Sequence, residues 1–238
     1  MEKYAQRVAL ITGANKGLGL EIARQLGQQG VAVVLGARQG KAQAPAAELR
    51  AQGLDAHAVE LDVTNAADIA ALPGFLQDTF GRLDILVNNA GVQLDTGFET
   101  SPDILRQTYE ANVIGPYAIT QALLPLLRQA PAGRIVNQSS ILGSLATIGA
   151  GQGGSWATPG YTSSKAALNM LTVVFAQHLA NSPIKVNAAH PGWVKTDLGG
   201  PDALLDVQEG ARTAVRLALL PADGPTGGYF HNEEQLPW

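Results

Sequence analysis

The sequence contains no cysteine and only four histidines among its 238 residues. Without cysteine, the chain can form no disulfide, no thiolate metal site and no cysteine nucleophile, which suits a reducing compartment. The histidines are scattered without the spacing of metal ligands, so we expect no metal site. Structural or exposed positions are expected for all four of them: His57, His178, His190 and His231.

Charge and long apolar runs are also scarce. Charged residues make up 15% of the chain, and 16 Lys+Arg against 20 Asp+Glu leave a net charge of −4. This balance argues against nucleic acid or an anionic membrane as a partner. No apolar run approaches the roughly 20 residues that span a bilayer, and residues 1–4 lead into a strand-like stretch rather than into the apolar core of a signal peptide. We expect a cytoplasmic protein that acts on a small molecule.

What is present is a regular alternation of short Val- and Ile-rich runs with helical stretches. Such runs are typical of strands buried on both faces, and they occur at 8–11, 31–35, 56–61, 83–87, 134–136 and 185–189. Helices are expected at roughly 17–29, 41–52, 66–80, 102–128, 161–180 and 207–219. The alternation predicts an α/β fold, a Rossmann-type doubly wound parallel sheet of about seven strands flanked by helices. No linker or repeat divides residues 1–238, so we expect a single domain.

A glycine loop joins the first expected strand to the first expected helix. Its glycines allow a tight turn, and the following helix N-terminus attracts a pyrophosphate. The spacing differs from the common Gly-x-Gly-x-x-Gly fingerprint, but its place between strand and helix favours dinucleotide binding over a plain turn. The predicted cofactor residues here are Gly13, Asn15, Lys16, Gly17, Leu18 and Gly19.

The second expected strand is followed by Arg38, where an NAD-binding fold usually places an acid on the ribose 2′-hydroxyl. Arginine accommodates a 2′-phosphate that a carboxylate would repel, and Lys16 adds a second cation from the glycine loop. The two residues favour NADP(H). The alternative is that both are solvated loop residues.

Tyr161 and Lys165 stand four residues apart, directly after Pro159-Gly160. On a helix their side chains share one face, with Cβ atoms roughly 5 to 6 Å apart. A neighbouring cation favours the phenolate, so the pair can work as a tuned acid and base. Alone, such a pair also fits two ordinary solvated helix residues.

With both features placed, the chain resembles the short-chain dehydrogenase/reductase family along nearly its whole length. The family's other motifs occur in order: Asp62 and Val63 after the third strand, Asn88-Asn89-Ala90-Gly91 after the fourth, Asn112 in a helix, Ser140 after the fifth, and Pro191, Gly192, Val194 and Thr196 after the sixth. The resemblance implies that Asp62 and Val63 approach the adenine, and that Asn89, Ala90 and Gly91 lie beside the cofactor. It further implies that Thr196 and the backbone after Pro191 bind the carboxamide.

The resemblance also implies the catalytic roles. Tyr161 is expected to protonate the carbonyl oxygen during hydride transfer, while Lys165 holds the nicotinamide ribose and lowers the Tyr161 pKa. Asn112 is expected to hold a water in a proton relay to Lys165, and Gly115-Pro116 after it predicts a kink. Adjacent strand residues face opposite ways, so only one of Ser139 and Ser140 can point into the site. The family pattern implies Ser140 as the residue that binds the substrate oxygen, with Ser139 as the alternative.

The chain is most similar to the carbonyl reductase branch of the family. That similarity rests on 13–17, 191–197, 209–211, 219–221 and 224–230. It implies NADPH-dependent reduction of a ketone, aldehyde or quinone. A 3-oxoacyl-thioester reductase and a non-catalytic NADP(H) sensor are the alternatives.

A glycine-rich spacer lies at 143–160, longer than in most short-chain reductases and shorter than the insertion of animal carbonyl reductases. It is expected to form either a substrate rim carrying Trp156 or a plain surface loop. Trp193 is a further expected substrate contact. Monomer and homo-oligomer both remain open.

Overall fold

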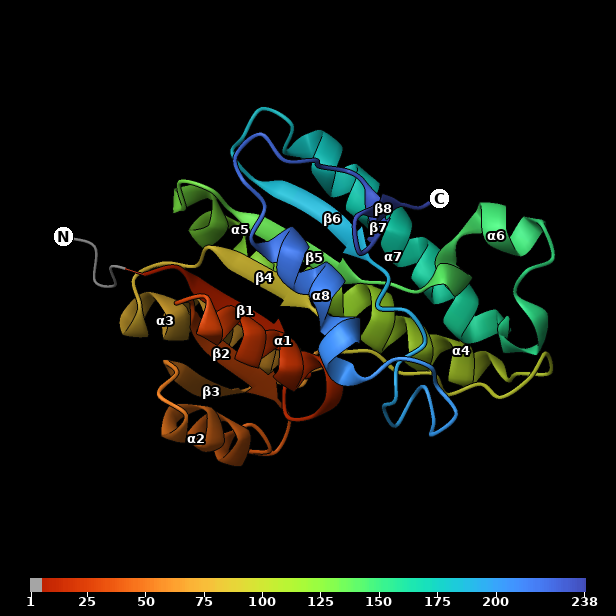
Figure 1. Ribbon diagram of the computed structural model, residues 1–238, viewed down its shortest axis with the longest axis horizontal. Helices are drawn as coiled ribbons and strands as arrows, with labels where there is room; N and C mark the ends of the chain where they lie inside the picture. The colour runs from red at the N-terminus through yellow and green to blue at the C-terminus, as the bar shows by residue number, and fades with distance from the viewer. Residues whose placement is uncertain (1–5) are drawn as a thin grey trace.

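The computed structural model describes residues 6–238 and is built around one eight-stranded sheet (Figure 1). The strand order is β3-β2-β1-β4-β5-β6-β7-β8. The strands are β1 (Val8–Thr12), β2 (Ala32–Ala37), β3 (Ala56–Glu60), β4 (Ile85–Asn88), β5 (Arg134–Gln138), β6 (Lys185–Ala189), β7 (Tyr229–His231) and β8 (Glu234–Gln235). All neighbours pair in parallel except β7 and β8. The predicted doubly wound parallel sheet is therefore confirmed.

The described residues form one short strand more than the expected number of about seven. β8 is only two residues long and turns back on β7 through Asn232, whose φ is 50°. A two-residue strand leaves no periodic pattern in a sequence. The six predicted strand cores lie within two residues of the observed ones, and in every one of these strands except β3 nearly all side chains are buried.

Helices cover both faces of the sheet. The long ones are α1 (Gly17–Gln28), α2 (Gln43–Ala51), α3 (Ala66–Thr79), α4 (Pro102–Tyr109), α5 (Gly115–Gln129), α7 (Pro159–His178) and α8 (Val207–Ala218). One apolar core joins α1, α2 and α8 to the sheet, and a second joins α3, α5 and α7 to the opposite face. Figure 1 shows α1 and α8 side by side in front of the strands.

The expected helix at 102–128 is interrupted. α4 runs into the π-helix η1 (Glu110–Ile114) before α5 begins, directly before the Gly115-Pro116 pair where the sequence predicts a kink. Proline cannot donate a helical hydrogen bond, and Gly115 lies so close to β3's following turn that a Cβ there would be 2.6 Å from the carbonyl oxygen of Val63. The interruption therefore lies directly against the turn that follows β3.

The spacer at 143–160 contains short helices and is not an open loop throughout. It contains α6 (Leu145–Gly149) and the 3-10 turn η3 (Gly154–Trp156), and the 3-10 turn η2 (Ile141–Gly143) ends at its first residue. Within residues 6–238, no helix is both long enough and apolar enough to cross a bilayer. The prediction about a signal segment at residues 1–4 lies outside the described residues.

Candidate active site

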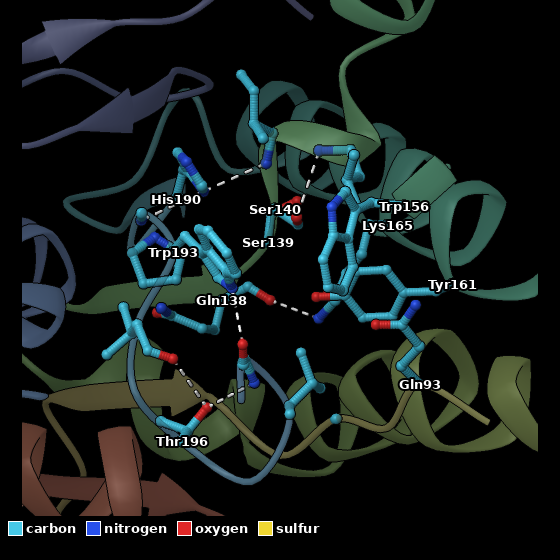
Figure 2. A pocket seen from close by; sticks show the side chains of 18 of the residues that line it. Gln93, Gln138, Ser139, Ser140, Trp156, Tyr161, Lys165, His190, Trp193 and Thr196 are labelled. Atoms are coloured by element: carbon cyan, nitrogen blue, oxygen red, sulfur yellow. Dashed lines mark hydrogen bonds between the residues drawn. The ribbon is translucent and has the colours of Figure 1, made fainter. Parts of the chain in front are cut away.

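A cavity of about 360 Å³ opens at the carboxyl ends of β4, β5 and β6 (Figure 2). In a parallel sheet this edge collects the residues that follow each strand. Twelve residues predicted from the sequence line it: Leu18, Asn89, Gly91, Ser140, Trp156, Tyr161, Lys165, Pro191, Gly192, Trp193, Val194 and Thr196. The predicted cofactor residues that do not line it are Gly13, Asn15, Lys16, Gly17, Gly19, Arg38, Asp62, Val63 and Ala90, and Asn112 also lies outside the lining.

Tyr161 is held at the first turn of α7 by a carboxylate that the sequence analysis missed. Asp95 is buried and accepts hydrogen bonds from the backbone N–H groups of Gly160 and Tyr161. It thus caps the free N–H groups of the helix N-terminus. A Cβ at Gly160 would lie 2.9 Å from the Asp95 carboxylate, so glycine is needed for this close approach.

Lys165 is 4% exposed and also belongs to α7. Its Nζ donates to the backbone carbonyl of Gln138 at 2.8 Å and lies 5.6 Å from the centre of the Tyr161 ring. Burial lowers the pKa of Lys165 to about 8. Burial raises the pKa of Tyr161 to about 12, and a hydrogen bond with Ser140 acts in the opposite direction. Burial is the larger of the two effects, so the pKa of Tyr161 lies above its ordinary value. The expected lowering by Lys165 stays a prediction.

The two serines after β5 have different partners. Ser139 donates from Oγ to Oδ1 of Asn169 at 2.6 Å, so its hydroxyl is occupied in the core. Ser140 lies within hydrogen-bonding reach of the Tyr161 hydroxyl, and Figure 2 shows both serines at the back of the cavity. Of the two serines, Ser140 is therefore the one whose hydroxyl lies next to the Tyr161 phenol at the cavity.

Asn112 sits in the π-helix and is fully buried. Its Oδ1 accepts from the backbone N–H of Val92, and its Nδ2 donates to the Val92 carbonyl and to Oγ of Ser164, all within 3.0 Å. Both amide protons are therefore used, and the side chain clamps the turn after β4 against α7. Gly91 lies between Asn112 and Lys165, because a Cβ there would be 3.2 Å from Oδ1 and 3.3 Å from Nζ.

The glycine loop interlocks with the turn after β4. Gly13 has φ 64°, and a Cβ there would approach Cα of Ala90 to 2.9 Å. Asn89 donates from Nδ2 to the Thr12 carbonyl at 2.9 Å, and a Cβ at Gly19 would meet that same amide at 2.5 Å. Any side chain at these glycines would separate the two segments.

The N-terminus of α1 has no competing ligand from its own side chains. Lys16 is its N-cap residue, its side chain makes no cap hydrogen bond, and the first turn contains no acidic residue. The backbone N–H groups of this turn and the positive end of the helix dipole are therefore available to an anion. This arrangement fits a phosphate.

The predicted cofactor residues at the carboxyl ends of the strands form what we call the cofactor strip. The residues expected to bind the 2′-phosphate lie at its outer end. Arg38 follows β2, and its guanidinium is 3.9 Å from the carboxylate of Asp62, which follows β3. Partial burial opposes ionisation of Asp62, but hydrogen bonds from Thr64 and the charge of Arg38 outweigh it and lower its pKa. Lys16 forms an ion pair with Asp197, which joins the glycine loop to the segment after β6.

The segment after β6 forms the wall opposite α7. Gly192 has φ 83°, which a glycine adopts without strain. Thr196 accepts from the Gly199 N–H at 3.1 Å and donates to the Val194 carbonyl at 3.3 Å. These hydrogen bonds within the segment hold the backbone of the wall in place.

Two tryptophans form the rim of the cavity. The rings of Trp156 and Trp193 are 5.7 Å apart between centroids, and the residues are 56% and 40% exposed. Trp193 donates from Nε1 to the Gly199 carbonyl at 2.7 Å. The spacer at 143–160 is thus part of the cavity rim and not a plain surface loop.

The alternative residue Ser139 also lines the cavity, and several lining residues were absent from the predicted site: Gln93, Gln138, Ile141, Leu142, Gln152, Gly153, His190, Leu198 and Gly199. His190 accepts from the N–H groups of Ile141 and Gly192 through Nδ1, and burial lowers its pKa to about 3. This agrees with the expected structural role for His190. Gln138 was detectable, because it stands two residues before Ser140 and strand alternation places both on one face.

The fold and the cavity define a doubly wound dinucleotide-binding protein, and comparison with known proteins narrows this class. The family model described as short chain dehydrogenase matches residues 7–203. The chain belongs to this short-chain dehydrogenase/reductase family.

Named relatives align along almost the whole chain. "Short-chain dehydrogenase/reductase 1" of Saponaria officinalis is 36% identical, covering 98% of this chain and 96% of that protein. "Carbonyl reductase [NADPH] 1" of Sus scrofa is also 36% identical, covering 98% of this chain and 94% of that protein. These alignments extend over 293 and 277 positions, more than the 238 residues of the chain, so the relatives contain segments that it lacks.

Solved structures agree with this placement. The carbonyl reductase Sniffer of D. melanogaster has a TM-score of 0.86 at 29% identity, covering 98% of this chain and all of that one. An NADPH-bound carbonyl reductase from chicken fatty liver has a TM-score of 0.83 at 29% identity, covering 98% and 99%.

Proposed function

We propose that the protein is an NADPH-dependent reductase that converts a ketone, aldehyde or quinone to an alcohol, with Tyr161 as the general acid. The observation that carries the proposal is the shared surface of three groups: the Tyr161 phenol, the Ser140 hydroxyl and the Lys165 ammonium, all at one cavity. A carbonyl oxygen placed against the phenol and the hydroxyl receives a hydrogen bond from each. The relatives named as NADPH carbonyl reductases support the same reaction.

NADP(H) is the proposed cofactor, and this chain's residues fit it along the whole strip. The uncapped N-terminus of α1 suits the pyrophosphate, and Arg38 with Lys16 suits the 2′-phosphate. Lys165 is proposed to hold the nicotinamide ribose hydroxyls, and Thr196 with the backbone after Pro191 to hold the carboxamide. When bound, the cofactor supplies the hydride.

Tyr161 is proposed to work as an acid and not as a base in the free protein. Because burial raises its pKa to about 12, the phenol keeps its proton throughout the neutral range. A protonated phenol is the form needed to donate to a carbonyl oxygen that gains negative charge as hydride arrives. A water held at Asn112 is proposed to pass a proton to Lys165, and this relay would return a proton to Tyr161 after turnover.

The substrate is proposed to be apolar next to its carbonyl. Trp156, Trp193 and Leu198 supply large exposed apolar side chains to the cavity lining, and Ile141 and Leu142 supply less exposed ones. Aromatic faces of this kind favour planar or cyclic ketones and quinones. The cytoplasm is the proposed location.

The test is NADPH oxidation over a panel of aldehydes, α-dicarbonyls, quinones, cyclic ketones and acetoacetyl thioesters, with Tyr161→Phe as the matched variant. Turnover of carbonyls that falls by about 10² to 10⁴ in Tyr161→Phe, with NADPH still bound, is expected. Preference for the acetoacetyl thioester would favour the 3-oxoacyl-thioester reductase. Binding of NADPH with no turnover of any compound would favour the sensor, and full activity in Tyr161→Phe would exclude Tyr161 as the acid.

A further inference from the structure

Gln138 places a buried amide without hydrogen-bond partners on the wall of the cavity. The residue ends β5 and is 5% exposed. Its backbone carbonyl accepts from Lys165, but within residues 6–238 neither Nε2 nor Oε1 of its side chain has a partner. Both atoms nevertheless belong to a residue that lines the cavity. A buried amide in this state destabilises the protein unless a ligand or water completes its hydrogen bonds.

The neighbouring amide shows that β5 normally satisfies such groups. Asn137 accepts from Asn88 through Oδ1 and donates to Thr172 through Nδ2, both at 2.9 Å. Asn137 and Gln138 face opposite sides of the sheet because strand residues alternate. Two adjacent residues of β5 therefore differ: the Asn137 amide, which faces the core, has hydrogen-bond partners, and the Gln138 amide, which faces the cavity, has none within residues 6–238.

The place of Gln138 identifies which part of the cavity its amide serves. Figure 2 shows Gln138 between Lys165 and Thr196, on the side where Trp193 and Thr196 lie, with Tyr161 and Trp156 on the other side. Its backbone is tied to the lysine that is proposed to hold the nicotinamide ribose. Its side chain shares a cavity with Thr196 and Pro191, which are proposed to hold the carboxamide.

A glutamine amide presents one donor group and one acceptor side by side. The complementary ligand group presents an acceptor and a donor in the reverse order, and a primary carboxamide has this form. A ketone, aldehyde or quinone oxygen offers an acceptor only and would leave Oε1 without a donor. The nicotinamide ring carries a primary carboxamide, so the cofactor fits this amide better than the substrate does.

We propose that the Gln138 side chain binds the carboxamide of the nicotinamide through two hydrogen bonds. Nε2 donates to the carboxamide oxygen, and Oε1 accepts from the carboxamide NH₂ group. The inference rests on the proposed function, because it takes NADP(H) as the ligand. Gln138 would then orient the nicotinamide ring together with Thr196 and the backbone after Pro191, which are proposed to hold the same carboxamide. The open amide is a binding group prepared for the cofactor.

The experiment is calorimetric titration of wild type and Gln138→Met with two ligands, NADP⁺ and 2′-phospho-ADP-ribose. Methionine keeps the length and volume of the side chain and removes both amide atoms. The second ligand retains the adenosine, the phosphates and both riboses but lacks the nicotinamide. We expect Gln138→Met to weaken NADP⁺ about 10-fold and to leave 2′-phospho-ADP-ribose unchanged.

A third ligand separates the two hydrogen bonds. In 3-acetylpyridine adenine dinucleotide phosphate an acetyl group replaces the carboxamide, so the oxygen remains and the NH₂ is lost. We expect Gln138→Met to weaken this analogue less than it weakens NADP⁺, because only one of the paired bonds is available. If Gln138→Met weakened NADP⁺ and the 3-acetylpyridine analogue by the same factor, the proposed pair of hydrogen bonds would be overturned.

Folding is checked in the same samples. Without ligand, the thermal midpoint of Gln138→Met should equal or exceed that of wild type, because an unpaired buried amide is removed. A lower midpoint with equal loss for NADP⁺ and 2′-phospho-ADP-ribose would mean a structural role and would overturn the proposal. Unchanged NADP⁺ affinity with a raised KM for the carbonyl would assign Gln138 to the substrate and would also overturn it. Failure of wild type to bind NADP⁺ would instead reject the proposed function itself.

Discussion

The cationic side chains at the two ends of the proposed cofactor strip, Lys165 and Arg38, differ in burial and in partners. At the inner end Lys165 is 4% exposed, has a backbone partner and has a pKa lowered by burial. At the outer end the Arg38 side chain is 65% exposed and its carboxylate neighbour is 3.9 Å away. The inner cation is part of the core, whereas the outer one is free to move to a ligand. Substitutions at the outer end should therefore change cofactor choice with little effect on folding, and changes at the inner end should affect protonation and chemistry.

The largest effect is expected at the outer end, from reversing the charge of Arg38. Arg38→Asp removes a guanidinium that suits a phosphate and replaces it with a repelling carboxylate. The dissociation constant for NADPH should rise about 100-fold, while that for NADH should change little. Fluorescence titration of both cofactors measures this.

Arg128→Asp is the matched control, since it makes the same charge change at the exposed end of α5. It should leave both dissociation constants unchanged. Equal weakening of NADPH and NADH by Arg38→Asp would contradict a 2′-phosphate site at Arg38.

The inner end should respond to pH. Because burial lowers the pKa of Lys165 to about 8, its ammonium loses its proton as the pH rises through that value. If the ammonium holds the nicotinamide ribose, the NADPH dissociation constant should be flat below pH 8 and rise up to about 10-fold per pH unit above it. Titrations from pH 6 to 10 measure this.

Adenosine 2′,5′-bisphosphate is the control ligand, because it lacks the nicotinamide and its ribose. Its affinity should show no change near pH 8. If the dissociation constants of NADPH and adenosine 2′,5′-bisphosphate changed equally near pH 8, the titrating group would lie at the outer end and not at Lys165. The two ends would then not differ in the way described above.

A smaller effect is expected from the carboxylate that anchors α7. Asp95→Ala leaves the backbone N–H groups of Gly160 and Tyr161 without their acceptor. We expect a loss of about 1 to 2 kcal/mol in the free energy of unfolding and a several-fold lower kcat with little change in KM, because Tyr161 is held less firmly. Denaturant unfolding and steady-state kinetics measure the two effects.

Asp95→Asn tests the cap itself, because asparagine retains one oxygen acceptor and is a comparable helix cap. It should restore most of the stability and of kcat. Loss of stability in Asp95→Ala without any change in kcat would show that the cap supports folding only.

The smallest effect is expected at the rim. Trp156→Ala removes one ring of the tryptophan pair and should raise KM for planar aromatic carbonyls a few-fold, with less change for small aldehydes. Leu145→Ala, at an exposed position in the same spacer, should leave both unchanged. Equal KM changes for aromatic and small substrates would mean that Trp156 does not contact the substrate.

The parts of the fold that were predictable are those with a local pattern. Runs such as 8–11 fall within the observed strand because a strand buried on both faces is apolar along most of its length. The glycine loop was found because strand, turn and helix signals follow one another directly. α7 begins two residues earlier than expected because Pro159 takes the first helical position, where proline is favoured.

Other features depend on neighbours that only the folded chain provides. Asp95 lies 65 residues before the N-H group that it caps at Gly160, so nothing around it in the sequence indicates its role. The burial that raises the pKa of Tyr161 was missed for a similar reason. Helical spacing places Lys165 beside Tyr161, but this local spacing does not reveal that both side chains are buried in the folded chain.

The tryptophan pair at the cavity mouth gives the protein its own optical probe. The chain has three tryptophans. Two of them are Trp156 and Trp193 at the rim, and Trp238 stacks on Tyr229 with ring centroids 5.5 Å apart. Because a reduced nicotinamide absorbs light in the range where tryptophan emits, NADPH entering the cavity should quench the rim pair by energy transfer. A stopped-flow record of that quenching would follow cofactor entry and release in the unlabelled protein, in real time.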